Sequence, residues 1–97
     1  MGFVQIVEFT SPDLDAVRKI DAAWEKATQG KRTARRQIVT RDRNNTDHHM
    51  VLVFFDSYES AMQNSDLPET KAFAEQYRAV TNEVRFHDLD VVSDEEL

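Results

Sequence analysis

Apolar and polar positions along the chain change their spacing at intervals, and each change marks an expected element. Residues 2–9 are rich in valine, isoleucine and phenylalanine, which predicts a strand. Apolar residues then recur every three or four positions over residues 14–29, which predicts an amphipathic helix that ends at Gly30. We expect Ser11 to cap this helix and Pro12 to occupy its first helical position, because a serine hydroxyl satisfies a free backbone N–H and proline lacks one.

The middle of the chain predicts two strands joined by a short turn. Residues 34–43 place Ile38 and Val39 among charged side chains, a pattern typical of a strand at the edge of a sheet. The polar cluster Asn-Asn-Thr-Asp at residues 44–47 then precedes an apolar run over residues 48–55. Two strands flanking so short a connection predict a hairpin.

The last part of the chain predicts two helical segments and a final strand. A short helix is expected over residues 56–62, capped at its start by the Asp-Ser pair that opens it. A second helix is expected to begin with a capping box of Asp66 and Glu69, with Pro68 in its first turn. Residues 84–92 predict the last strand.

The order of these elements is β-α-β-β-α-β, which predicts an α+β domain of the ferredoxin-like class with a four-stranded antiparallel sheet and helices on one face. We expect one such domain over residues 1–92 and an acidic tail over residues 93–97. The strand at residues 48–55 carries apolar side chains on both faces, because neighbouring side chains alternate. The uncovered face therefore predicts a homodimer whose sheets pack face to face, or a sheet that stacks a ligand.

Composition narrows the class of protein. The chain has 97 residues, 40% of them hydrophobic, which fits one compact domain. It has no cysteine, so it offers no disulfide and no thiolate site. We expect a cytoplasmic protein without a signal peptide or a membrane span, because its longest apolar run is far shorter than the roughly 20 residues that cross a bilayer.

Charge is unevenly distributed along the chain. The net charge is −6, yet residues 31–43 carry +5, so the rest carries −11. This stripe has two interpretations: solvated charges that protect an edge strand, or a surface that faces an anion or a partner. We expect no nucleic-acid partner, since an acidic body repels phosphate and residues 48–55 lack the basic-Gly-aromatic pattern of the RNA-recognition fold.

Three histidines are the first candidates for chemistry. His48 and His49 are adjacent, so they face opposite sides of a strand and do not bind one metal together, and we expect no metal site. His87 and Asp88 face apart for the same reason. We take His49 and His87 as candidate catalytic residues, each with a buried or solvated structural role as the alternative.

Other polar and aromatic side chains are candidates for ligand binding. Gln5 lies in the middle of the first predicted strand, where its amide needs a partner from the protein or from a ligand. Trp24 lies on the apolar side of the first helix, where a core role is the alternative. Tyr58, Met62 and Asn64 belong to the short helix or its exit, which we expect to cover a cavity behind the sheet.

A resemblance to a known family strengthens this fold prediction. The passage TRDRNNTDHHMVLVFFDSYESAMQNSDLPET and the ending FHDLDVV resemble the dimeric α/β-barrel superfamily, in particular small bacterial proteins of the antibiotic-biosynthesis-monooxygenase-like group. The resemblance implies a homodimer with a cavity between sheet and helices in each protomer. Members of this superfamily include cofactor-independent oxygenases of polycyclic phenols, haem-degrading enzymes and isomerases.

Residue types separate these branches. The haem-degrading branch has an asparagine on the first strand, a tryptophan on the third and a histidine on the last helix, whereas this chain has Gln5, a single tryptophan at Trp24 and no histidine in PETKAFAEQYRAVT. No haem or other cofactor is therefore expected. The phenol-oxygenase branch uses asparagine, tyrosine and tryptophan around an aromatic substrate, and Trp24, Tyr58 and Asn64 supply these types.

Two functions stay open from the sequence. The first is a cofactor-independent monooxygenase that binds an aromatic or phenolic molecule, with His49 or His87 as the base and Tyr58 and Gln5 as orienting groups. Tyr77, on the last helix, is a further ligand-binding candidate. The second is a non-catalytic association or stress-related domain whose cavity is filled by Trp24, Phe73 and Tyr77.

Overall fold

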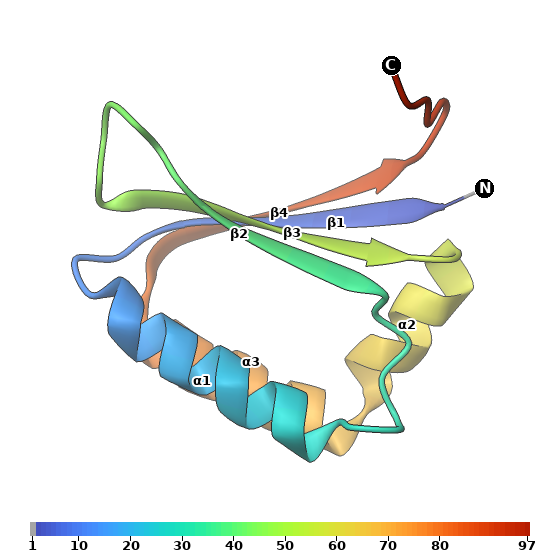
Figure 1. The fold of residues 1–97 in the computed structure, drawn as a ribbon. Coiled ribbons are helices and arrows are strands. Elements are labelled where there is room, and N and C mark those ends of the chain that lie inside the picture. Colours follow the sequence, from blue (N-terminus) through green and yellow to red (C-terminus); the bar gives the residue numbers. More distant parts are fainter. Residues whose placement is uncertain (1) are drawn as a thin grey trace.

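The computed structural model describes residues 2–97 and contains four strands and three helices within them. Their order confirms the predicted β-α-β-β-α-β arrangement, with two consecutive helices in the second half (Figure 1). The elements are β1 (Phe3–Thr10), α1 (Leu14–Ala27), β2 (Arg36–Arg41), β3 (His48–Phe55), α2 (Tyr58–Asp66), α3 (Pro68–Val80) and β4 (Asn82–Asp90).

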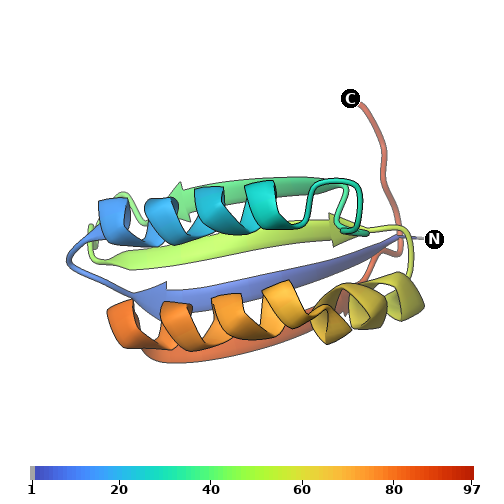
Figure 2. The ribbon, with the colours of Figure 1, turned by 90° about the horizontal axis from the view of Figure 1, so that it is seen from below.

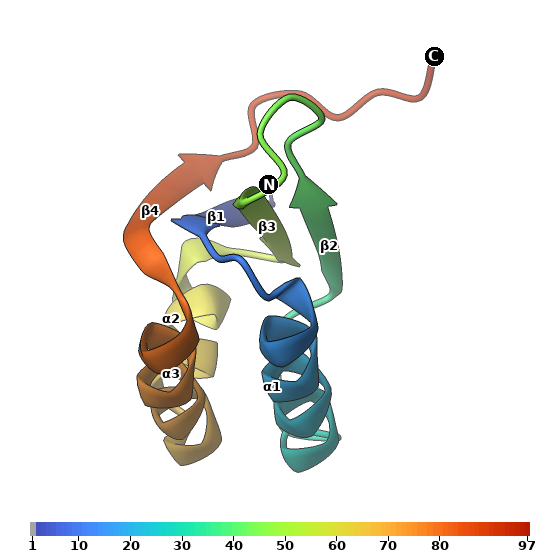
Figure 3. The same cartoon turned by 90° about the vertical axis from the view of Figure 1, so that its left-hand side faces the viewer.

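The four strands form one antiparallel sheet in the order β2-β3-β1-β4, which confirms the ferredoxin-like fold class. The helices all lie on one face of this sheet (Figure 3). Viewed from the side of the helices, α1 lies over the half of the sheet formed by β2 and β3. The other two helices, α2 and α3, lie over the half formed by β1 and β4 (Figure 2). The basic residues 31–43 include β2, so the prediction that they contribute an edge strand is confirmed.

Strand register assigns each side chain to a face. Phe9 pairs with His49 and Val7 pairs with Val51, and these four face the helices. Phe9, Val17, Val51 and Tyr77 form the main core, and Phe3, Phe55 and Ala61 form a second cluster near α2. The opposite face of the sheet is apolar in its middle and is covered by no helix within residues 2–97 (Figure 3). Its apolar side chains are Val4, Ile6, Ile38, Met50, Leu52, Phe54 and Leu89.

The start of α1 differs from the sequence prediction. Asp13, not Ser11, is the N-cap, and its Oδ1 accepts a hydrogen bond from the Ala16 N–H at 3.1 Å. Ser11 is buried, and its hydroxyl donates to the Val80 carbonyl oxygen at 3.0 Å. The Ser11 prediction was wrong because this hydroxyl joins the end of β1 to the end of α3. Pro12 was also misplaced, since it precedes the cap and is not the first helical residue.

The two later helices begin in different ways. Ser57 caps α2 in a reciprocal capping box with Ser60, which confirms the predicted start. The predicted capping box of Asp66 and Glu69 was wrong, because Asp66 is the last residue of α2. The N-cap of α3 makes no side-chain hydrogen bond, and Pro68 occupies its first turn as predicted.

Residues 91–97 carry no helix or strand and run from the end of β4. Within the described residues, the helices are too short and too polar to cross a bilayer.

Candidate functional site

A cavity of about 590 Å³ lies between the sheet and the helices. Its walls come from every helix and every strand, and most of the surface that lines it is apolar. A volume of this size suits a drug-sized molecule, and an apolar cavity with a few polar groups is the usual form of a small-molecule site. The apolar lining includes Val7, Val51, Val53, Phe73, Val84 and Phe86.

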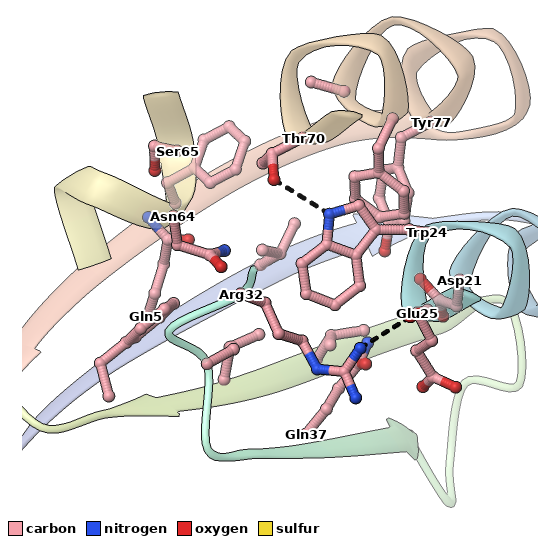
Figure 4. Close-up of a pocket in the computed structure, with 18 of the residues that line it drawn as sticks. Gln5, Asp21, Trp24, Glu25, Arg32, Gln37, Asn64, Ser65, Thr70 and Tyr77 are labelled. Carbon is pink, nitrogen blue, oxygen red and sulfur yellow. Dashed lines mark hydrogen bonds between the residues drawn. The ribbon is translucent and has the colours of Figure 1, made fainter. Parts of the chain in front are cut away.

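Three aromatic rings form one wall of the cavity (Figure 4). The ring centroids of Trp24 and Phe73 are 5.8 Å apart, and those of Phe73 and Tyr77 are 5.1 Å apart. Arg32 places its guanidinium 5.9 Å from the Trp24 ring centroid and donates a hydrogen bond to the Glu25 carbonyl oxygen. The alternative in which Trp24, Phe73 and Tyr77 fill the cavity is wrong, because the three side chains line an open space.

Trp24 is fixed in this wall by one hydrogen bond. Its Nε1–H donates to Thr70 Oγ1 at 3.0 Å, which links α1 to α3 across the cavity (Figure 4). We expect Thr70→Val to lower the free energy of unfolding by about 1 kcal/mol, because the indole N–H loses its partner. Urea denaturation followed by circular dichroism measures this change. Thr70→Ser keeps the hydroxyl and serves as the control, and an equal loss in both variants would contradict the role of the bond.

Asp21 and Tyr77 place two unsatisfied polar atoms at one end of the cavity. Asp21 is 4% exposed and Tyr77 is 7% exposed. Asp21 Oδ2 and the Tyr77 hydroxyl are both buried without a hydrogen-bond partner. Both residues line the cavity and lie side by side there (Figure 4). Buried polar groups are nearly always paired, so these two atoms need a partner that the chain does not supply.

Burial changes the acidity of both groups. It raises the pKa of Asp21 from 3.8 to about 6, although the charge of Arg18 acts in the opposite direction. The neighbouring Glu25 carboxylate raises this pKa further, and the Gln37 amide lowers it. Burial and the Asp21 charge also raise the pKa of the Tyr77 hydroxyl, which therefore stays a hydrogen-bond donor. A carboxylate of this acidity can accept a proton at neutral pH.

Asp21 also borders a second, smaller depression. This depression has a volume of about 210 Å³ and lies between α1 and β2. Its lining includes Arg18, Glu25, Gln37 and Val39. Asp21 therefore separates the apolar cavity from a polar recess.

The structure brings several of the predicted ligand-binding residues into the cavity lining, namely Gln5, Trp24, Asn64 and Tyr77. Gln5 Nε2 donates to Asp88 Oδ1 at 3.2 Å across the pair of strands β1 and β4. Asn64 Oδ1 accepts from the Thr33 N–H at 3.2 Å, which holds the loop before β2 against α2. Groups of the protein therefore satisfy part of the hydrogen-bonding capacity of both side-chain amides.

Tyr58 and Met62 lie away from this lining. Tyr58 is 51% exposed, and its ring meets Phe3 edge to face at a centroid distance of 5.5 Å. Met62 packs against the second apolar cluster. The cavity meets α2 at its last turn, through Asn64 and Ser65, whereas Tyr58 and Met62 lie earlier in that helix.

Neither candidate catalytic histidine contributes to the cavity lining. His49 is 1% exposed, and its ring nitrogens lie 3.3 Å from the Thr40 carbonyl oxygen and 3.4 Å from that of Ser11. Its side chain faces the helices, but its ring lies beyond the Phe9 ring, with 5.4 Å between the two ring centroids. His87 projects from the opposite face of the sheet, where its Nε2 lies 3.0 Å from Glu8 Oε1.

Glu8 joins two histidines on that opposite face. His48 Nε2 lies 2.8 Å from Glu8 Oε2, so one carboxylate contacts histidines from β3 and β4. Both contacts lower the pKa of Glu8, and the contact with His87 has the larger effect. Among the described residues, no group of three histidine, cysteine or acidic side chains is arranged to hold a metal ion.

Sequence reasoning missed Asp21. The helical period that placed Val17 and Trp24 on the apolar side of α1 also places Asp21 there, because the three are spaced by four and three residues. An acidic residue inside an apolar stripe was the signal that could have identified it.

Comparisons with known structures agree on the fold, that of antibiotic-biosynthesis-monooxygenase-like proteins. SnoaB, a cofactor-independent oxygenase from Streptomyces nogalater, aligns with a TM-score of 0.81 at 11% identity over 96% of this chain and 95% of its own. Rv0793 from Mycobacterium tuberculosis aligns with a TM-score of 0.77 at 13% identity over 99% of this chain and all of its own, 100%.

A third structure, from Chloroflexus aurantiacus, carries a provisional assignment as an antibiotic biosynthesis monooxygenase. It aligns with a TM-score of 0.75 at 17% identity, over 99% of this chain and 98% of its own. No protein-family model matches the sequence, and no curated protein matches it either. The resemblance seen in the sequence is confirmed at the level of the fold.

Proposed function

We propose that this protein binds an aromatic, phenolic molecule in the cavity and oxygenates it without a cofactor. The observation that carries the proposal is the apolar cavity of about 590 Å³, in a fold shared with a cofactor-independent oxygenase. The aromatic wall of Trp24, Phe73 and Tyr77 suits the flat face of a ring system. The absence of cysteine agrees with a cytoplasmic location.

In this reaction the protein has two tasks, which are to position the substrate and to transfer protons. An electron-rich phenol supplies all four electrons that reduce O₂: one oxygen atom becomes the new carbonyl oxygen of the ring, and the other leaves as water. With 1-naphthol the balanced products are 1,4-naphthoquinone and water. An apolar cavity excludes bulk water from the oxygenated intermediate, and a nearby base favours the phenolate that reacts with O₂.

An oxygen electrode tests this function. We expect the protein to consume O₂ in the presence of 1-naphthol without added metal or flavin, with one molecule of 1,4-naphthoquinone formed for each O₂. Heat-denatured protein gives the background rate. Binding of 1-naphthol without O₂ uptake would contradict the oxygenase activity and leave the open cavity as a non-catalytic binding site.

We also propose that two copies pair through the uncovered face of the sheet. Leu52 lies at the centre of this face, paired with Ile6 on β1 and Ile38 on β2. Val4 and Phe54 extend the apolar surface toward one end. A contiguous apolar surface of this kind is typical of an interface, and a second copy offers a matching one.

Native mass spectrometry tests the pairing. We expect the unmodified protein at twice its chain mass of 11.2 kDa. We expect Leu52→Lys at the monomer mass with unchanged circular dichroism, because it places a charge in the middle of the apolar face. The control is Gln63→Lys on the exposed side of α2. A Leu52→Lys dimer would contradict this interface.

A further inference from the structure

The geometry points to Asp21 and Tyr77 as the pair that selects a hydroxyl-bearing ligand in the cavity, with Asp21 Oδ2 accepting from the ligand hydroxyl and the Tyr77 hydroxyl donating to a ligand oxygen. This inference rests on the proposed function, which it deepens by assigning the residues that recognise the substrate. It replaces the histidines of the sequence-based hypothesis, since neither His49 nor His87 lines the cavity.

The first support is the pair of unmatched atoms. Asp21 Oδ2 is an acceptor and the Tyr77 hydroxyl is a donor, and neither has a partner among the described residues. Both side chains are more than nine-tenths buried. Two buried polar groups without partners raise the free energy of the empty protein. A ligand that forms hydrogen bonds with both groups removes this penalty, which strengthens its binding.

The second support is the neighbourhood of the pair. Tyr77 continues the aromatic wall through Phe73, with 5.1 Å between ring centroids. A ring that stacks along this wall therefore presents its edge substituents to the end where Asp21 lies (Figure 4). Other polar side chains of the lining, such as Gln5, Asn64 and Thr70, already make hydrogen bonds within the chain.

The third support is how Asp21 is connected. Charged groups face it from its own helix, Arg18 and Glu25, and polar groups face it from β2 and α3, Gln37 and Tyr77. Its raised pKa makes this carboxylate a better acceptor and a stronger base toward a ligand hydroxyl than an ordinary aspartate.

Equilibrium dialysis under nitrogen, with 1-naphthol and 1-methylnaphthalene as probes, tests this assignment. The two compounds have the same rings and differ in the hydroxyl, and the absence of O₂ prevents turnover. We expect the unmodified protein to prefer 1-naphthol by roughly tenfold or more, the value of a hydrogen bond to a charged group. We expect Asp21→Asn and Tyr77→Phe each to lose most of that preference while 1-methylnaphthalene binding changes less than about twofold.

Two further measurements separate recognition from structure. Asp15→Asn is the matched control, because it makes the same change at an exposed position of the same helix, and it keeps the preference. The preference of the unmodified protein falls as pH is lowered through about 6, where Asp21 takes up a proton. The Asp21→Asn variant shows no such change with pH.

The outcomes are distinct. If the preference for 1-naphthol persists in both cavity variants, or is absent from the unmodified protein while both compounds bind, the pair does not select the hydroxyl and the cavity proposal stands. If neither compound binds, the proposed function and this inference both fail. Tyr77→Phe is expected to fold normally because its hydroxyl has no partner to lose, so a folded variant is available for the test.

Discussion

Asp21→Asn is expected to raise the free energy of unfolding by about 2 to 3 kcal/mol at pH 7.5. The reason is the pKa of Asp21, which is about 6 in the folded protein and 3.8 in its ordinary state. Below pH 3.8 the Asp21 carboxyl is protonated in both the folded and the unfolded protein, so it does not lower the free energy of unfolding. As pH rises through the interval, the unfolded state ionises first, so stability is lost until both states are ionised, at about 1.4 kcal/mol for each pH unit.

Urea denaturation at pH values from 4.5 to 7.5 measures this difference. The difference between the variant and the unmodified protein should be about 1 kcal/mol at pH 4.5 and grow as pH rises toward 7, because the asparagine does not titrate. Asp15→Asn, on the exposed side of α1, should follow the unmodified protein at every pH. A constant offset between the Asp21→Asn variant and the unmodified protein would show that Asp21 does not carry the expected penalty.

Phe9→Ala is expected to lower the free energy of unfolding by about 3 to 5 kcal/mol, the usual cost of removing a buried phenylalanine. Phe9 is 0% exposed and contacts rings on both sides. Its centroid lies 5.2 Å from that of Tyr77 and 5.4 Å from that of His49. Small domains have about 5 to 15 kcal/mol in total, so this loss is a large share of the stability of the domain.

Thermal and urea unfolding followed by circular dichroism measure this loss. Phe86→Ala removes the same side chain from a position that is 62% exposed, and it should cost less than about 1 kcal/mol. Equal costs for the two variants would contradict the central position of Phe9 in the core.

The order of elements could be predicted because hydrophobic spacing depends on local sequence. The apolar period of α1 and the two-sided apolar pattern of β3 were sufficient to place both elements. The cap of α1 could not be predicted in the same way. Ser11 and Asp13 are both good caps, and the choice between them depends on the Val80 carbonyl, which is 69 residues away from Ser11.

The candidate site was less predictable than the fold. Gln5, Trp24, Asn64 and Tyr77 were named from their types, and the structure places them in the cavity lining. The face of each histidine depends on strand register, since a shift by one residue exchanges the faces. The register that pairs Phe9 with His49 directs His49 toward the helices, but at the end of the sheet away from the cavity.

The position of Trp24 has an experimental consequence. It is the single tryptophan of the chain, so light emitted on indole excitation comes from one ring. That ring lies on the cavity wall, beside a guanidinium and bonded to Thr70 on the neighbouring helix. The protein therefore contains its own optical probe, and a compound library can be screened for occupants of the cavity by spectral shift without attaching a dye.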